Sequence, residues 1–400
     1  MGAELAALAR LAAPLFAGQL AVVGLSITDL VLAGHAGRAD VAGVVLGATL
    51  FELPLMFVVG VFAAGAALAG RLHGRGDFEG LAAHLRDCLG LALPTGAALC
   101  LLVLALRGLL LPALELADPV RAVASGYLLP MAATAALLPA LIALRTTLEA
   151  AGHPQVAMAL NLAGFFANIP LDLAFIHGAG PLPALGGAGC GWATLIVVAG
   201  ILAGLGLWAH RPATPAHLHF LARPAAPRWP ALGRLLLLGT PMGGAILAEA
   251  GFFYAIPLLA APLGTLPLAA HAVALSLDFA MFIAPLALGQ AVTIRTAAAL
   301  GRGAGNEARR SVRAGLAAAL GLGLLQALAV AAARRHVAAL YAPDAEVAEL
   351  AARLLAVAGR LGAMEPIVAV WWAILAAVAA AAFLSLGFLA RLLPRGGDLG

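Results

Sequence analysis

Carboxyl and amide side chains occur within apolar stretches of this sequence, where ionisable residues are rare. Asp29 follows two hydroxyl residues near the end of the first stretch, and Asn168 and Asp172 lie four residues apart with Pro170 between them. A spacing of four places two side chains on one helix face, and the proline frees a backbone carbonyl. An acid, an amide and a free carbonyl could bind H⁺ or Na⁺. An interhelical hydrogen-bond clasp, or for Asp29 a side chain that reaches the interface, is the alternative.

Four more acids are candidates for the same kind of chemistry. Glu249 stands among small residues, and Glu365 precedes a proline in a long apolar stretch. Glu52 and Asp278 are weaker candidates, since each could stand at a helix turn and face a vestibule. A charge at mid-bilayer costs roughly 3 kcal/mol on insertion scales, so a retained one indicates function.

The composition decides which elements must carry these residues. The 400 residues are 63% apolar and 10% charged, whereas soluble domains have about 45–50% apolar and about 25% charged residues. This excludes a soluble enzyme, a disordered chain and a secreted disulfide scaffold, and it predicts an all-α polytopic membrane protein with 10–12 transmembrane helices. A span needs about 20 apolar residues, and the stretches that qualify lie near 11–34, 44–70, 88–114, 122–148, 155–177, 188–209, 234–261, 268–299, 314–333 and 346–375, followed by an apolar run at 376–393.

The arginines predict the orientation of these spans. All 23 basic residues are arginine, and they are spread over short loops rather than clustered, so no nucleic-acid partner is predicted. With a cytoplasmic amino terminus, 16 arginines fall on the cytoplasmic side and 7 on the other. The positive-inside rule therefore favours both termini on the cytoplasmic side. The lack of lysine and the abundance of alanine and glycine indicate a GC-rich bacterial genome, so we expect a bacterial inner-membrane protein. The three isolated cysteines, Cys88, Cys100 and Cys190, are interpreted as small apolar fillers.

An internal repeat divides the chain into two lobes. A shift of 227 residues places Pro14 on Pro241 and the Gly74–Gly76 triplet on the Gly301–Gly303 triplet, without gaps. We therefore expect a six-helix lobe at 1–210, a proline-rich cytoplasmic linker at 211–230 and a second lobe at 231–400. The copy of the first lobe should end about 37 residues beyond residue 400, so we expect the carboxyl-terminal lobe to lack about one helix. Parallel repeats with a site between them are a transporter architecture.

No enzyme motif occurs in the sequence: a phosphate-binding loop with lysine, GxSxG, HExxH and paired Asp-rich motifs are all missing. The chain is therefore predicted not to be an enzyme and to need no cofactor. Without an ATP site, the energy for transport must come from an ion gradient.

Several motifs resemble those of the multidrug and toxic compound extrusion (MATE) exporters, in particular the NorM-like bacterial branch. They extend over about residues 5–370 in the family's order: Ala12–Pro14, Thr28–Gly34, Ala150–Pro154, Asn168–Asp172, Gly186–Thr194, Ala261–Gly264 with Ala269–His271, and Pro285–Arg295. The resemblance implies two six-helix lobes that export cationic amphipathic compounds by alternating access, driven by inward H⁺ or Na⁺.

The resemblance also implies roles for single residues. The amino-lobe coupling site, where Na⁺ or H⁺ would bind, looks like Asp29, Asn168 and Asp172, supported by Tyr127 and Thr194. Glu249 and Glu365 look like the carboxyl-lobe acids. Glu365 replaces a family aspartate, and Leu361 stands where a tyrosine is expected.

The predicted function is therefore a secondary active efflux transporter for small cationic drugs or toxic compounds, monomeric and surrounded by membrane lipid. A lipid-linked precursor flippase of the same superfamily is one alternative, although its cavity should be cationic rather than acidic. A truncated, inactive membrane scaffold is the other, and a membrane prenyltransferase would require metal-binding acid clusters that the sequence lacks.

Overall fold

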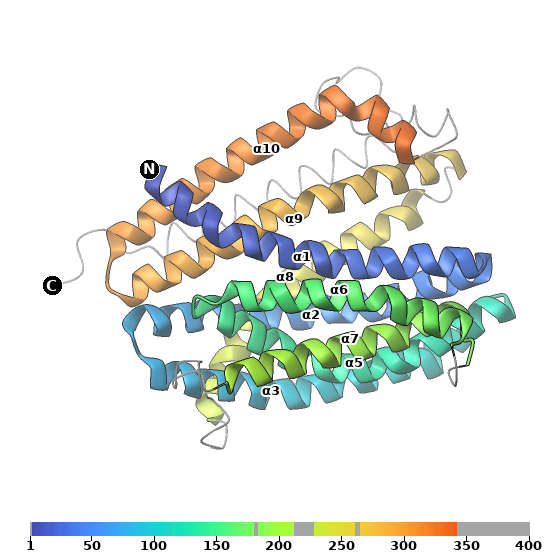
Figure 1. Ribbon diagram of the computed structural model, residues 1–400, viewed down its shortest axis with the longest axis horizontal. Helices are drawn as coiled ribbons and strands as arrows, with labels where there is room; N and C mark the ends of the chain where they lie inside the picture. Colours follow the sequence, from blue (N-terminus) through green and yellow to red (C-terminus); the bar gives the residue numbers. More distant parts are fainter. Residues whose placement is uncertain (1, 115, 180–182, 212–227, 261–264, 342–400) are drawn as a thin grey trace. The chain divides into compact units, whose positions relative to one another are not determined.

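The computed structural model describes residues 2–114, 116–179, 183–211, 228–260 and 265–341, with side chains except at 252–280 and at most positions after 326. The described chain consists of long helices joined by short turns, without a β-strand among these residues (Figure 1). Eight described stretches are long and apolar enough to cross a membrane. These findings confirm the prediction of an all-α polytopic membrane protein. The predicted spans at 346–375 and 376–393 lie outside the described residues.

The helices extend beyond the apolar stretches that predicted them, because hydropathy detects only the part of a helix that lies in hydrocarbon. The first predicted span, 11–34, lies within a 35-residue helix, and the third, 88–114, includes a π-helical turn near its end. The elements are α1 (Gly2–Ala36), α2 (Arg38–Arg75), α3 (Phe78–Ala105), the π-helix η1 (Leu106–Leu110), α4 (Leu111–Ala113), α5 (Asp118–Ala150), α6 (Pro154–His177), the 3₁₀-helix η2 (Gly186–Ala188), α7 (Gly189–Ala209), α8 (Trp229–Ala260), α9 (Thr265–Gly301) and α10 (Gly305–Tyr341).

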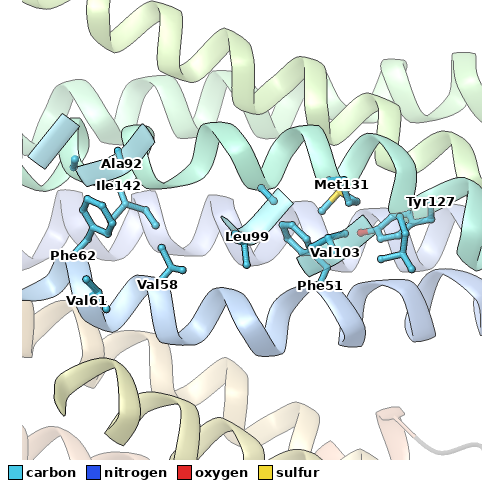
Figure 2. Close-up of a cluster of buried hydrophobic side chains, with 14 of the residues drawn as sticks. Phe51, Val58, Val61, Phe62, Ala92, Leu99, Val103, Tyr127, Met131 and Ile142 are labelled. Carbon is cyan, nitrogen blue, oxygen red and sulfur yellow. The ribbon is translucent and has the colours of Figure 1, made fainter. Parts of the chain in front are cut away.

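The chain forms two compact units. The first contains residues up to 251 together with 283–320, and the second contains 252–282 and the residues from 321 onward. In the first unit, α5 packs against α2, α3 and α7, and α1 packs along α6. Side chains such as Phe51, Leu99 and Met131 fill the space between α2, α3 and α5 (Figure 2). In the second unit, the Gln326 side-chain amide donates a hydrogen bond of 2.9 Å to the Met281 carbonyl.

The repeated glycine triplets make the same turn twice. Gly76, after the last residue of α2, has φ +70°, and Gly303, two residues after α9, has φ +73°. Glycine adopts this left-handed conformation without the steric cost that other residues meet, and it ends both long helices before the next one begins. The internal repeat found in the sequence therefore reappears as matching turns between α2 and α3 and between α9 and α10.

Glycines also let α2 approach α8 and α9 closely within the first unit. A Cβ atom at Gly60 would collide with the Gly243 backbone of α8, and a Cβ atom at Gly74 would collide with the Ala298 backbone of α9. Small residues allow such backbone contacts between membrane helices. These crossings hold the middle of α8 and the end of α9 against α2.

Candidate functional site

The candidate site is built where α1 lies against α6. A Cβ atom at Gly24 of α1 would overlap the Phe165 ring of α6, so glycine at this position permits the close approach of the two helices. About two turns away along α1, the Asn161 side-chain amide donates to the Gly18 carbonyl at 3.4 Å. The approach of α1 to α6 brings the acid near the end of α1 onto the face of α6 that carries Asn168 and Asp172.

Asn168 links the two acids. Its Nδ2 donates to Asp29 Oδ1 at 2.8 Å and to Asp172 Oδ2 at 2.5 Å. Thr194 Oγ1, from α7, donates to Asp29 Oδ2 at 3.1 Å. We call these four residues the acid cluster. Helix α1 thus meets the consecutive helices α6 and α7, far from it in sequence, at residues that the sequence analysis selected.

The acid cluster is shielded from its surroundings. Asp29 is 5% exposed, and Asn168 and Asp172 are fully buried. No arginine or histidine side chain is recorded in a hydrogen bond or ion pair with either acid among the described residues. Burial of uncompensated carboxylates is costly, so a group of this kind either takes up protons or binds a cation.

Two acceptor atoms of the acid cluster have no hydrogen-bond partner. Asn168 Oδ1 and Asp172 Oδ1 are both buried, and neither receives a hydrogen bond. Buried polar atoms without partners call for a physical explanation. Carboxylate, amide and hydroxyl oxygens are the ligands that hard cations prefer, and a carboxylate oxygen can also bind a proton. The residues present therefore fit either H⁺ or Na⁺ as the ion that the site would exchange.

The two supporting residues from α5 and α2 lie around this cluster. Tyr127 is buried at one end of the hydrophobic core of Figure 2, close enough to Asp29 and Asp172 to interact with their charges. Its ring packs where Gly47 leaves room on α2. Glu52 of α2 is half-buried and interacts electrostatically with both Asp29 and Tyr127.

The acids of the second half of the chain are not part of the described cluster. Glu249 lies on α8 with an exposed side chain. Asp278 lies on α9, but its side chain is not among those described, and Glu365 lies outside the described residues. The structure thus brings the predicted residues of the amino-terminal half together, and the roles assigned to the residues of both halves stay predictions.

Sequence reasoning missed a polar contact at the beginning of α8. Asp87 of α3 is buried, and its Oδ1 accepts a hydrogen bond of 2.9 Å from the Arg228 backbone N–H. Its Oδ2 accepts two more from the Arg228 guanidinium, at 3.1 and 2.6 Å. These bonds to the carboxylate raise the pKa of Arg228 above its ordinary value. The isolated acid at the beginning of an apolar stretch was the only sequence signal.

Known proteins resemble the chain over most of its length. The family model described as MatE matches residues 14–174 and 241–364. The chain belongs to the MATE family of transporters. This membership confirms the family resemblance found in the sequence, and it confirms that the protein is a membrane transporter and not an enzyme.

Individual relatives agree with the family model. The chain is 34% identical over 361 residues to the multidrug resistance protein PmpM of Pseudomonas aeruginosa, a match covering 88% of this chain and 74% of the relative. Among solved structures, it matches the Vibrio cholerae MATE transporter VcmN in the bent form with a TM-score of 0.75 at 22% identity, covering 89% of this chain and 80% of VcmN. It matches the eukaryotic MATE transporter AtDTX14 with a TM-score of 0.76 at 20% identity, covering 88% of this chain and 79% of the other. These matches confirm the predicted MATE fold.

Proposed function

We propose that this MATE protein is a secondary active exporter that exchanges inward H⁺ or Na⁺ for small cationic amphipathic compounds. We further propose that it works as a monomer in the bacterial inner membrane, surrounded by lipid and with the amino-terminal end of α1 on the cytoplasmic side. The bacterial relative PmpM, a multidrug resistance protein, supports the substrate class. The arginine distribution supports the orientation.

The acid cluster is the observation that carries this proposal. Two carboxyl groups share one amide NH₂ group in a buried position, and one acceptor oxygen on Asp172 has no partner. If both groups were ionised without a counter-ion, their repulsion would add to the cost of burial. The cluster therefore requires a positive charge, which an entering ion supplies.

This requirement gives a simple route to ion coupling. The ion supplies one positive charge to the pair formed by Asp29 and Asp172, which removes most of their repulsion and favours a conformation in which the cluster stays closed to water. Loss of the ion restores the negative charge, which favours the state that admits a cation. A ligand shifts the equilibrium between the two conformations only if it binds one of them more tightly than the other. Here the coupling ion and the cationic substrate both bind through the same carboxylates, so binding of one disfavours binding of the other.

The test is efflux of a cationic dye from proteoliposomes under separate pH and Na⁺ gradients. Asp172→Asn removes one charge of the cluster and is expected to abolish gradient-driven efflux. Asp118→Asn is the matched control, because the Asp118 side chain is 87% exposed. Efflux by the parent under only one gradient identifies the coupling ion, and unchanged efflux by Asp172→Asn contradicts the coupling assignment.

The same assay separates the alternatives. No dye efflux by the parent under either gradient, together with transfer of a lipid diphosphate between leaflets, would favour a flippase. Neither activity would favour an inactive scaffold. The acids of the described cluster favour the cation exporter, because a diphosphate-binding cavity needs positive charge.

A further inference from the structure

A second polar contact lies near the opposite end of α1 from Asp29. Glu4 Oε1 accepts hydrogen bonds from Arg295 Nε at 2.8 Å and from Ser311 Oγ at 2.6 Å. Glu4 Oε2 accepts a third, from the Arg295 guanidinium at 3.0 Å. Arg295 belongs to α9 and Ser311 to α10, so one carboxylate joins α1 to two helices that follow almost 300 residues later. All three residues lie in the first unit.

A small apolar cluster continues this contact along α1. Leu8 and Leu15 of α1 are buried against residues of α9 and α10, namely Ala287, Ala291, Ile294 and Ala314. Further apolar side chains, Leu5, Leu11, Phe16 and Val292 among them, are partly buried against the same cluster. The apolar cluster and the three charge-assisted hydrogen bonds of Glu4 therefore act together to hold α1 against these two helices.

The exposure of the charged groups suits a contact that opens and closes. The Glu4 side chain is 15% exposed and the Arg295 side chain 33%. Both groups are partly exposed, so other polar partners can replace their mutual hydrogen bonds at modest cost when they separate. A fully buried pair would instead leave an uncompensated charge, which is strongly destabilising.

We propose that Glu4, Arg295 and Ser311 form a releasable latch between α1 and α9–α10, which keeps the transporter closed at the face where α1 begins. In this proposal Glu4 is a positioning residue for alternating access. The inference rests on the proposed transport function, because a transporter must break its closing contacts at one face in each cycle. About 25 residues, or roughly 37 Å at 1.5 Å per residue, separate Glu4 from Asp29 along α1. One helix therefore carries an ion-site acid near one end and the latch near the other.

The latch is tested by measuring its opening directly. Spin labels at Ala9 of α1 and Asn306 of α10, both exposed, report the distance between the helices. The label variant has alanine in place of the three native cysteines. A second label pair, at Ala9 and the exposed Ala159 of α6, reports a distance that opening of the latch leaves unchanged.

Glu4→Gln is expected to shift the Ala9–Asn306 distribution toward longer distances, with the closed-to-open ratio lowered about five- to tenfold. This range lies between exposed ion pairs and partly buried charge-assisted hydrogen bonds. Glu307→Gln is the matched control: Glu307 pairs with Arg302, and both side chains are at least half-exposed. The control distribution should stay unchanged.

The charge-reversed pair Glu4→Arg with Arg295→Glu distinguishes a latch from a merely structural contact. Restored short distances in the double variant, beside long distances in each single variant, support the latch. Equal distributions in the parent, Glu4→Gln and Arg295→Gln would overturn it. Because the distances are measured without substrate, the latch can fail while gradient-driven efflux persists, and the reverse can also occur.

Discussion

Replacing Asn168 by leucine tests the acid cluster most sharply. Leucine has the same branching and number of heavy atoms but no donor, so the substitution removes the hydrogen bonds to Asp29 and Asp172. Its larger volume is matched by the same substitution in the control. Hydrogen bonds to charged groups contribute about 1.5–3 kcal/mol each. Two such bonds from one shared NH₂ group are not fully additive, which leaves about 2 kcal/mol, or about a thirtyfold effect, since 1.4 kcal/mol is tenfold.

The chain offers a matched control on the same helix. Asn161 is also buried on α6 and also donates to α1, but its partner is the neutral Gly18 carbonyl at 3.4 Å. Gradient-driven dye efflux in proteoliposomes should fall about thirtyfold in Asn168→Leu and stay within about twofold of the parent in Asn161→Leu, because a long neutral hydrogen bond contributes at most about 0.5 kcal/mol. Equal losses in both variants, or efflux above half the parent rate in Asn168→Leu, would refute the reasoning.

Three further outcomes are expected. Gly60→Ala should lower the melting temperature in detergent, with a loss of about 1–3 kcal/mol in the free energy of unfolding, because the new methyl group meets the α8 backbone. The control Gly200→Ala, whose methyl group would meet no atom within 4 Å, should leave the melting temperature unchanged. Equal melting temperatures of the two variants would contradict the close crossing. Asp87→Ala should lower the free energy of unfolding by about 1–2 kcal/mol in the same assay, less than for a fully buried ion pair, because the Arg228 side chain is 59% exposed. An unchanged melting temperature would show that the Asp87–Arg228 contact does not stabilise the fold. Glu249→Gln should slow efflux of a cationic dye but not of a neutral one, and equal effects on both would remove its predicted role.

The acid cluster could be predicted because its signal is local. Asn168 and Asp172 share a helix face by their spacing, and Asp29 is conspicuous in an apolar stretch, where charge is expensive. What joins them is visible only in the structure: Asn168 points both amide hydrogens at acids from two helices, and Thr194 arrives from a third. Sequence spacing indicates which side chains are neighbours on one helix, but not which helices pack together.

The latch could not be predicted for the same reason. Glu4 and Arg295 are separated by 291 residues, and each looks like an ordinary charge near the end of a helix. Helix ends were also underestimated, because α1 begins at Gly2 whereas its apolar stretch begins near residue 11. The charged ends of membrane helices form contacts that a hydropathy pattern does not reveal, because it detects only the apolar part of each helix.

The anchored beginning of α8 determines how this helix can bend. Arg228 is bonded to α3, and Leu232 and Leu235 are buried in the core of the first six helices. Further along, Gly243 crosses α2 in backbone contact, whereas Gly244 and Gly251 have free space around them. Contacts therefore fix α8 at its first turns and again at Gly243. When the carboxyl-terminal part of α8 moves, the helix is expected to bend just after Gly243, so that Glu249 moves and Arg228 stays in place.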